Sequence, residues 1–277
     1  MTIERPEVSI IVVAHSVRTE LERCFASIDR HAGMSTETIL VDNASTDDTK
    51  SWVRRTHPDV NLIALPGNEF GAARNHALGR AAGRYTMFLD SDASLTTGAL
   101  PAMVSALDRN PDWGLLGPKL VYEDGGLQLS CRRFPPRSLP LLRRPPLDRF
   151  FDDGRIVREH LMAEADHDRP RPVLYMISAC HLFRSSLARE TGPIDESLSY
   201  GWEDADWCIR IRDAGGEVVY FPEATVVHSY RRLTRRRPVS NAAWRQLLSH
   251  AHFQRKYRRR RRELIELDRE LEAKTIA

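Results

Sequence analysis

Residues 8–14 read VSIIVVA, a run that is apolar except for Ser9 and rich in β-branched side chains. Such a run is typical of a strand buried on both faces, as in a parallel sheet covered by helices. Three further strand-like runs follow at 37–42, 61–66 and 84–90, with helical patterns between them. Strands that alternate with helices predict right-handed βαβ units. We therefore expect an α/β fold with a Rossmann-like, mostly parallel central sheet flanked by helices.

Apolar spacing and capping residues predict the helices. We expect a first helix over 17–30, a second opened by Ser45 or Thr46, and a third over 71–83 that Gly83 closes. A helix over 97–109 and a strand in WGLLGPKLVY (113–122) complete this regular half of the chain.

The regular pattern ends at residue 131. Residues 131–150 contain five prolines and six arginines, which favours a long surface excursion, able to act as a lid, over a regular helix or strand. Order returns in PVLYMIS (172–178), in helices at 185–191 and through GWEDADWC (201–208) to Ala214, and in two short strands within 217–230. From Asn241 onward we expect helix.

The composition is that of a soluble globular protein: 277 residues, 42% hydrophobic and 29% charged. The N-terminus lacks the apolar run of a signal peptide, and no apolar stretch approaches the ~20 residues of a membrane span. These features predict a cytoplasmic, non-spanning protein. The four cysteines form no CxxC pair, so we expect reduced core residues rather than a zinc site or disulfides.

Acidic residues follow two of the predicted strands. Asp42 ends the second, within DNASTDDT, and Asp90-Ser91-Asp92 ends the fourth. Residues two apart on a strand face the same way, so Asp90 and Asp92 can converge on Mg²⁺ or Mn²⁺ beside a substrate diphosphate. The alternative is that both segments are simple turns. A GxGxxG after the first strand and a GxxxxGK[ST] are both absent, which argues against dinucleotide enzymes and P-loop ATPases.

Several motifs occur in a characteristic order: VSIIVVAHS, LVDNASTDDT, GNEFGAARNHAL, YTMFLDSDA and GWEDADWC running to VVH at 228. Over residues 8–230 this order resembles the family 2 inverting glycosyltransferases of GT-A fold, most of all their rhamnosyltransferase-like branch. The resemblance implies a nucleoside diphosphate sugar donor, with dTDP-rhamnose expected. It also implies a glycan or polyprenyl-linked acceptor in bacterial cell-envelope or polysaccharide assembly.

The resemblance implies roles for individual residues. Asp42 would contact the nucleobase, Asp90 would face the ribose, and Asp92 with His228 would hold Mg²⁺ or Mn²⁺. His15 departs from the residues usual at its position in the family. The full set expected to bind the donor is Ala14, His15, Asp42, Asn43, Asn68, Gly71, Arg74, Asn75 and Asp90.

The carboxylates of GWEDADWC have two interpretations. The resemblance makes Asp204 the general base that accepts the proton of the acceptor hydroxyl, with Glu203 beside it and Trp202 and Glu203 contacting the acceptor. Neighbouring Glu203 and Asp206 would raise the pKa of Asp204. The alternative is that the carboxylates stabilise a helix N-terminus and that Trp202 is buried.

The resemblance and the composition together divide the chain into three parts. We expect a donor-binding half at 1–125, an acceptor-binding and catalytic half of the same GT-A domain at 126–240, and a basic amphipathic helical tail at 241–277.

Basic charge is concentrated near the C-terminus. Residues 228–262 hold thirteen Lys and Arg and no Asp or Glu, whereas the rest of the chain holds 28 basic and 38 acidic residues. With Trp244, Leu247, Leu248 and Ala251 at helical spacing, this tail predicts peripheral contact with an anionic membrane surface, the inner face of the cell membrane.

Other interpretations of the tail stay open. It can be a solvated helix packed on the domain, or an oligomerisation helix that uses Leu264, Leu267 and Leu271. Arginines interleaved with Phe253 and Tyr257 also fit a polybasic nucleic-acid-binding protein. The acidic remainder of the chain argues against that class, so we expect no nucleic acid. A non-catalytic nucleotide-sugar binder is the third alternative.

Overall fold

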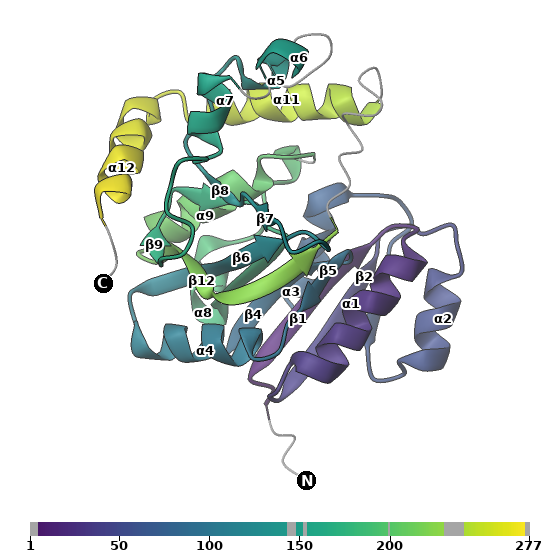
Figure 1. Cartoon of the computed structure of the whole chain (residues 1–277). Helices are drawn as coiled ribbons and strands as arrows, with labels where there is room; N and C mark the ends of the chain where they lie inside the picture. The colour runs from purple at the N-terminus through teal and green to yellow at the C-terminus, as the bar shows by residue number, and fades with distance from the viewer. Residues whose placement is uncertain (1–4, 143–147, 152–153, 199, 230–240, 275–277) are drawn as a thin grey trace.

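The computed structural model describes residues 5–142, 148–151, 154–198, 200–229 and 241–274. Two sheets are present in these ranges, and a large curled sheet forms the centre (Figure 1). The strands of the large sheet are β1 (Val8–Ala14), β2 (Thr36–Asp42), β3 (Asn61–Ala64), β4 (Tyr85–Asp90), β5 (Ala93–Leu95), β6 (Trp113–Val121), β7 (Leu127–Gln128), β9 (Arg171–Pro172), β11 (Cys180–Arg184) and β12 (Glu217–His228). β8 (Cys131–Arg132) and β10 (Tyr175–Met176) form the small sheet.

The predicted α/β architecture is confirmed. The main order is β3-β2-β1-β4-β11-β6-β12-β5, with β7 beside β6 and β9 beside β12. β1, β2, β3 and β4 are mutually parallel, and β6 is parallel to β12. β11 lies between β4 and β6 and is antiparallel to both, so the two groups of parallel strands on either side of it run in the same direction. This short strand, CHLFR, was not predicted because five residues give too little alternation to recognise.

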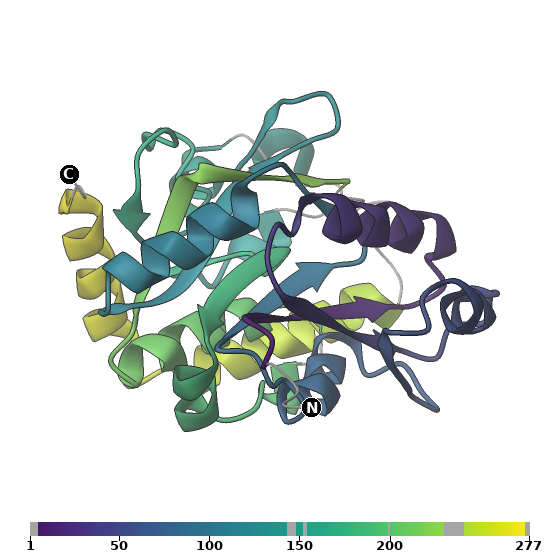
Figure 2. The same ribbon diagram turned by 90° about the horizontal axis from the view of Figure 1, so that it is seen from below.

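Helices cover both faces of the large sheet. They are α1 (Arg18–His31), α2 (Thr49–Thr56), α3 (Asn75–Leu78), α4 (Ala99–Arg109), α5 (Leu139–Leu142), α6 (Asp148–Phe151), α7 (Arg155–His160), α8 (Ser185–Thr191), α9 (Glu203–Asp213), α11 (Asn241–Lys256) and α12 (Arg261–Ala273), with 3₁₀ turns η1 (Phe70–Arg74) and η2 (Glu196–Leu198). α1 and α4 pack on one face and α8 and α9 on the other (Figure 2), and each face has its own buried apolar cluster.

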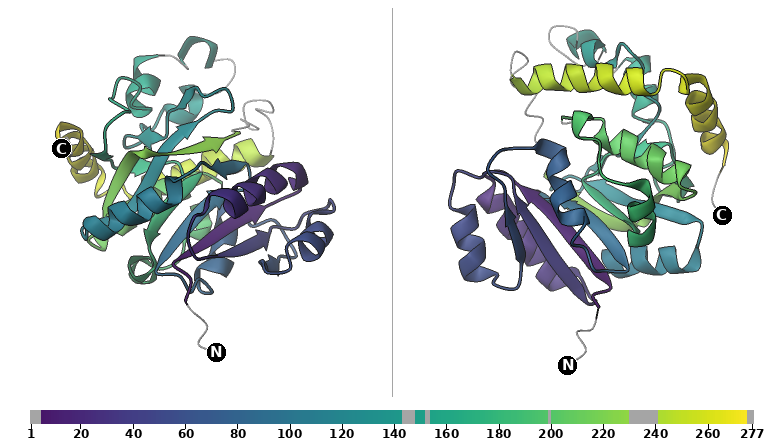
Figure 3. Two further views of the ribbon diagram at one scale, coloured as in Figure 1. Left: turned by 60° about the horizontal axis from the view of Figure 1, so that its bottom comes forward. Right: turned by 180° about the vertical axis from the view of Figure 1, so that it is seen from behind.

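The C-terminal helices are part of the globular fold. Phe253, Tyr257, Leu264 and Leu271 are buried in the cluster that also contains the apolar side of α9. Figure 3 shows α11 and α5–α7 together at the end of the molecule opposite the N-terminus. The expectation of an irregular excursion at 131–150 was wrong for its described residues, which include β8, α5 and α6 and the buried side chains of Phe134 and Leu139. Residues 143–147 lie outside the described residues.

Some local predictions were wrong. α2 begins at Thr49 after Asp48, because Ser45 and Thr46 instead exchange hydrogen bonds with Ser16 in the neighbouring loop. The helix expected over 71–83 is a 3₁₀ turn followed by one short helix that ends at Leu78. The two strands expected within 217–230 are one strand, β12, with an irregular register between Phe221 and Thr225.

Other expectations concern the chain as a whole. All four cysteines are buried and free, as predicted. Within the described residues, no helix combines the length and the apolarity that crossing a membrane requires. The predicted division at residues 125 and 126 falls in the turn between β6 and β7, and the division itself stays a prediction.

Gly83 provides a test of this fold. A Cβ atom at Gly83 would lie 2.5 Å from the backbone nitrogen of Ser9 and 2.6 Å from the carbonyl oxygen of Tyr85, whereas one at Gly79 meets nothing within 4 Å. Because backbone atoms of a central strand cannot move aside, we expect Gly83→Ala to lower the free energy of unfolding by about 1–3 kcal/mol. Gly79→Ala is the matched control and should be neutral in the same denaturant titration. Equal effects would contradict the close packing of Gly83 on β1.

Candidate active site

The strand register brings the predicted polar residues to one edge of the sheet. β1 lies between β2 and β4, with Ala14 opposite Asp42 and Val13 opposite Asp90. Parallel strands in register end at the same edge, so both aspartates emerge at the carboxyl ends of the strands. This is the edge at which open α/β sheets bind their ligands.

Asp90, Asp92 and His228 form a cluster at this edge. β12 pairs with β5 so that His228 lies opposite Ala93, and Ser229 donates its backbone N–H to the carbonyl of Asp92 at 3.0 Å. The Nε2 atom of His228 is 3.4 Å from Asp92 Oδ1 and 4.0 Å from Asp90 Oδ2. One ligand atom from each residue lies within 4.8 Å of the others, a spacing that fits a divalent cation.

Gln128 orients the imidazole of His228. Its Oε1 is 2.6 Å from Nδ1 of His228, so Nδ1–H donates to Gln128 and Nε2 faces the two aspartates. Burial lowers the pKa of His228, but the hydrogen bond with Asp92 and the charges of Asp90 and Asp92 outweigh it, and the net pKa is raised. Burial also raises the pKa of Asp90, which Arg74 opposes. Each shift reflects negative charge gathered in a confined space.

Arg74 is the buried cation of the site. Its guanidinium donates to Asp90 Oδ1 at 2.7 Å and to the hydroxyl of Ser178 at 2.9 Å, and it lies 4.9 Å over the ring of Phe88. These contacts hold the side chain in one orientation. Arg74 and Asp90, both predicted to bind the donor, are therefore in direct contact.

The other residues of the predicted donor set surround the ends of β1 and β2. Asp42 is fully buried, and its Oδ1 lacks a hydrogen-bond partner among the described residues. A buried acceptor without a partner is costly unless a ligand supplies a donor. Asn43 Nδ2 donates to Asn68 Oδ1 at 3.0 Å, and the exposed His15 bonds the carbonyl of Asn43 through Nδ1 at 2.7 Å.

Asn75 has a different geometry. Its side-chain amide donates to the carbonyl of Ile194 at 2.9 Å and accepts from the N–H of the same residue at 2.8 Å. Asn75 thus joins α3 to the segment that leads into α9. The donor-binding roles of Asn75 and of the other residues stay predictions.

Glu203 and Asp204 begin α9, as the motif predicted. Burial raises the pKa of Asp204 to about 6, against the opposing hydrogen bond from the N–H of Ala205. Burial and the charge of Asp204 raise the pKa of Glu203 to about 7. The direction predicted for the pKa of Asp204 is confirmed, but its main cause is burial rather than the predicted repulsion from Glu203 and Asp206. Gly71 leaves room for this pair, since a Cβ there would lie 2.7 Å from Glu203 Oε1.

One open cavity of about 440 Å³ connects these groups. Asp90, Asp92 and His228 line it together with Asp204, so the candidate cation cluster and the candidate base face the same space. The remaining walls are mainly apolar, with one arginine. They consist of Tyr122, Leu127, Gln128, Leu129, Arg132, Leu161, Ile177, Ser178 and Ala179.

Trp202 packs beneath the C-terminal segment. Its ring lies 4.7 Å from that of His250 and 5.9 Å from that of Phe253, both on α11. Trp202 is not among the residues that line the cavity, although its indole N–H is without a partner within the described residues. These contacts favour the buried alternative for the indole, and contact of Trp202 with an acceptor stays a prediction.

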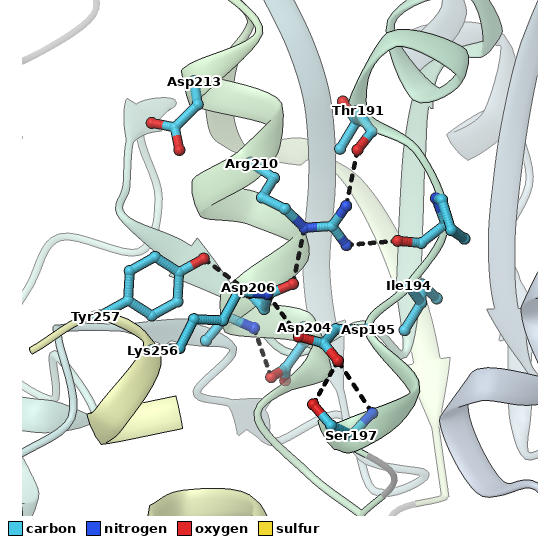
Figure 4. A network of polar contacts seen from close by, with 12 residues as sticks. Thr191, Ile194, Asp195, Ser197, Asp204, Asp206, Arg210, Asp213, Lys256 and Tyr257 are labelled. Carbon is cyan, nitrogen blue, oxygen red and sulfur yellow. Dashed lines mark hydrogen bonds and ion pairs between the residues drawn. The ribbon is translucent and has the colours of Figure 1, made fainter. Parts of the chain in front are cut away.

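Asp206 anchors α9 from the opposite side (Figure 4). This fully buried carboxylate accepts from the hydroxyl of Tyr257 at 2.8 Å and from Arg210 Nε at 2.8 Å, and it pairs with Lys256 Nζ at 2.5 Å. Arg210 continues to the carbonyls of Thr191 and Pro193. The basic segment therefore neutralises a buried charge of the helix that carries Asp204.

Sequence reasoning missed Gln128, Arg132 and Ser178. Gln128 orients His228, Ser178 holds Arg74, and Arg132 lines the cavity and lowers the pKa of Asp204. None of the three lies in a recognisable motif: Gln128 lies in the short strand β7, Arg132 in the short strand β8, and Ser178 between β10 and β11. Only their position after the proline-rich break or beside a short strand could have drawn attention to them.

Comparison with known proteins defines the class. Residues 9–192 match the family described as Glycosyl transferase family 2, and the chain belongs to that family. It is therefore a glycosyltransferase, and its fold is the GT-A fold.

Particular relatives agree with this assignment. The chain is 28% identical over 256 residues, 84% of its own length and 80% of the relative, to the N-acetylglucosaminyl-diphospho-decaprenol L-rhamnosyltransferase of Mycobacterium tuberculosis. It is 34% identical over 229 residues, 82% of its length and 61% of the relative, to the succinoglycan biosynthesis protein ExoO of Rhizobium meliloti.

Solved structures share the fold. A mannosyltransferase from Pyrobaculum calidifontis in complex with GDP-Man and Mn²⁺ superposes with a TM-score of 0.59 at 22% identity, covering 91% of this chain and 65% of that one. Residues 1–349 of S. aureus TarS superpose with a TM-score of 0.58 at 18% identity, covering 80% of this chain. The chain spans 60% of that TarS structure.

The Asp206 anchor generates a stability prediction. Tyr257→Phe removes a buried hydrogen bond to a carboxylate, so we expect the free energy of unfolding to fall by about 1–3 kcal/mol. For a chain of this size the thermal midpoint should fall by a few degrees, about 2–4 °C per kcal/mol. Tyr122→Phe is the matched control, because no hydrogen bond of its hydroxyl occurs within the described residues. An unchanged midpoint for Tyr257→Phe would remove Tyr257 from the anchor.

Proposed function

We propose that this glycosyltransferase transfers a sugar from a nucleoside diphosphate sugar to a hydroxyl of a glycan or lipid-linked acceptor, with inversion at the anomeric carbon. The proposed donor is dTDP-rhamnose, and the proposed acceptor is a polyprenyl-linked glycan of bacterial cell-envelope or polysaccharide synthesis. The names of the Mycobacterium tuberculosis and Rhizobium meliloti relatives support this choice.

One observation carries the proposal: Asp204 and the Asp90–Asp92–His228 cluster line the same cavity. A base and a diphosphate-binding group must face one space if a donor and an acceptor are to meet there. A non-catalytic nucleotide-sugar binder has no need of a raised-pKa carboxylate on the acceptor side of that space.

The cluster fits a Mg²⁺ or Mn²⁺ ion. Asp92 and His228 would hold it, with Asp90 adjacent, because carboxylate oxygens and an oriented imidazole are suitable ligands. A divalent cation bound there would neutralise charge on the departing nucleoside diphosphate, which then needs no protonating acid. In the proposed donor pocket, the unpartnered Oδ1 of Asp42 accepts from the nucleobase edge, and Asn43 and Asn68 hold the surrounding loops.

Asp204 acts as the general base in this proposal. The acceptor hydroxyl attacks the anomeric carbon from the face opposite the leaving group while Asp204 accepts its proton. A pKa near 6 leaves Asp204 ionised at neutral pH yet basic enough to assist the attack. Glu203, with the higher pKa and with Oε2 unpartnered within the described residues, would contact the acceptor in its protonated form.

We also propose that the C-terminal segment contacts an anionic membrane surface from the cytoplasmic side. Trp244 and Leu248 are exposed on α11, which is basic and holds no Asp or Glu. Phe253 and Tyr257, in contrast, are buried and cannot stack on nucleic-acid bases as the rival interpretation required. Leu264 and Leu271 are buried against the domain, which supports a packed helix for α12 rather than an oligomerisation helix.

Nucleotide binding tests the donor site. We would measure thermal unfolding with dTDP, UDP, GDP and ADP, each with and without Mn²⁺ or Mg²⁺. A nucleotide at about 100 times its Kd stabilises by about 2.7 kcal/mol, which raises the midpoint by roughly 5–10 °C for a chain of this size. We expect that rise with dTDP and metal, and its loss in Asp92→Ala because a cation ligand is removed. No rise with any nucleotide, from folded protein, would sink the proposal.

The pH dependence of transfer tests the base. Asp204 must be ionised to accept a proton, so kcat/KM should fall tenfold per pH unit below about 6. Asp204→Asn should lower kcat by a factor of about 10² or more, while the metal-dependent midpoint rise with nucleotide remains.

Glu203→Gln is the matched control for this experiment. Because Glu203 is mostly neutral when Asp204 titrates, the variant should keep an acid limb near pH 6. If Glu203→Gln abolished transfer and Asp204→Asn did not, Glu203 would be the base.

A further inference from the structure

Exposed apolar side chains gather at one end of the molecule. Seven large hydrophobic residues are exposed among the described residues, and six of them lie on α5, α6, α7 and α11. Soluble proteins rarely leave such residues clustered unless the surface binds something. The six are Leu141, Phe150, Phe151, Ile156, Trp244 and Leu248, and we call them the end surface.

The end surface is one continuous part of the fold. α5, α6 and α7 contact one another, and Figure 1 and the right view of Figure 3 show them and α11 at the end of the molecule opposite the N-terminus. Gln254 Nε2 donates to the carbonyl of Pro135 at 2.9 Å, and the rings of Phe134 and Phe253 lie 5.8 Å apart. The excursion after residue 131 and the C-terminal segment, distant in sequence, thus support the same surface.

Basic side chains accompany the end surface. Arg255 is exposed on α11, and Arg258 and Arg259 are exposed immediately after it, whereas the guanidinium of Arg245 lies 5.3 Å over the ring of Phe70. Apolar side chains that can enter the head-group region, beside arginines that can meet lipid phosphates, are typical of interfacial helices. Each such arginine adds about 1 kcal/mol of attraction to an anionic membrane. Two copies facing each other here would bring the same arginines together, which disfavours a homodimer.

We infer that the end surface docks on an anionic phospholipid bilayer, with Phe150, Phe151, Trp244 and Leu248 entering the head-group region. This rests on and deepens the proposed function, because it assigns the contact to α5–α7 as well as to the C-terminal helix. It also orients the cavity. Leu161, directly after α7, lines the cavity together with Asp204, so the cavity lies next to an element of the end surface.

Trp244 is a native probe of docking. It is 64% exposed, whereas Trp52, Trp113 and Trp207 are buried and Trp202 is packed against His250. The full chain would be titrated, without nucleotide, with phosphatidylcholine vesicles and with vesicles that also contain phosphatidylglycerol. We expect a blue shift of the tryptophan emission and quenching by brominated lipid with the anionic vesicles, weakened by salt. Trp244→Phe should lose the blue shift but still sediment with the vesicles.

Two pairs of substitutions separate the apolar and electrostatic contributions. Phe150→Ser with Phe151→Ser should weaken vesicle partitioning about tenfold or more, because buried ring area is lost. Arg258→Gln with Arg259→Gln should weaken it by about 30-fold at low salt. Arg54→Gln with Arg55→Gln, two exposed positions on α2 away from the end surface, is the charge-matched control and should bind as the unaltered protein does.

Several outcomes would overturn the inference. The inference is wrong if Phe150→Ser with Phe151→Ser leaves vesicle partitioning unchanged, or if the emission of Trp244 does not change on protein that sediments with vesicles. It is also wrong if Arg54→Gln with Arg55→Gln weakens vesicle binding as much as Arg258→Gln with Arg259→Gln does. Self-association that these phenylalanine substitutions abolish, without vesicle binding, would make the end surface a subunit interface instead. The nucleotide-induced rise in thermal midpoint reports the donor site separately. Its absence alongside intact vesicle binding would therefore count against the proposed function and not against docking.

Discussion

The ion pair between Arg74 and Asp90 is the interaction on which the site depends. The cavity gathers Asp90, Asp92 and Asp204, with Glu203 behind them, in a space where like charges repel strongly. Arg74 lowers the pKa values of Asp90, Glu203 and Asp204, so its charge offsets part of that repulsion at both ends of the site. A divalent cation in the cluster would offset more of it.

Two carboxylates of one helical turn have opposite tasks. Asp204 faces the cavity with its pKa raised, and Asp206 points away to Tyr257, Lys256 and Arg210. Two residues apart on a helix, side chains differ in direction by about 200°, so Asp204 and Asp206 point to opposite sides of α9. The charge of Asp206 is satisfied by side chains rather than by water, and the C-terminal segment thereby fixes the helix that presents the proposed base.

The same C-terminal segment joins the site to the end surface. Its inner side supplies Phe253 and Tyr257 to the core, and its outer side exposes Trp244, Leu248 and several arginines. The basic charge that the composition revealed therefore has two uses. Lys256 neutralises a buried carboxylate, while arginines nearby remain exposed at the surface proposed to meet lipid. Docking there would place the acidic cavity next to the bilayer.

The sequence by itself determined the strands that alternate with helices, because burial on both faces demands largely apolar runs such as VSIIVVA. It also placed Asp42 and Asp90 at strand ends and Glu203 and Asp204 at a helix start, since these positions follow from local pattern. The order of the motifs added the resemblance to a known family. Helix ends were less predictable. Hydrogen bonds that join Ser16, in another loop, to Ser45 and Thr46 decided where α2 begins, and no local sequence pattern predicts them.

Tertiary structure alone decided what the residues contact. His228 meets Asp92 because β12 pairs with β5 across more than 130 positions of sequence, and Gln128 orients it from a third strand. Burial, which sets the pKa of Asp204, is a property of the whole packed molecule and not of its neighbours in sequence. The end surface likewise exists only because α5–α7 and α11 fold to one side. The composition shows that the C-terminal segment is basic, but only the fold brings the helices that carry Phe150 and Trp244 to the same end of the molecule.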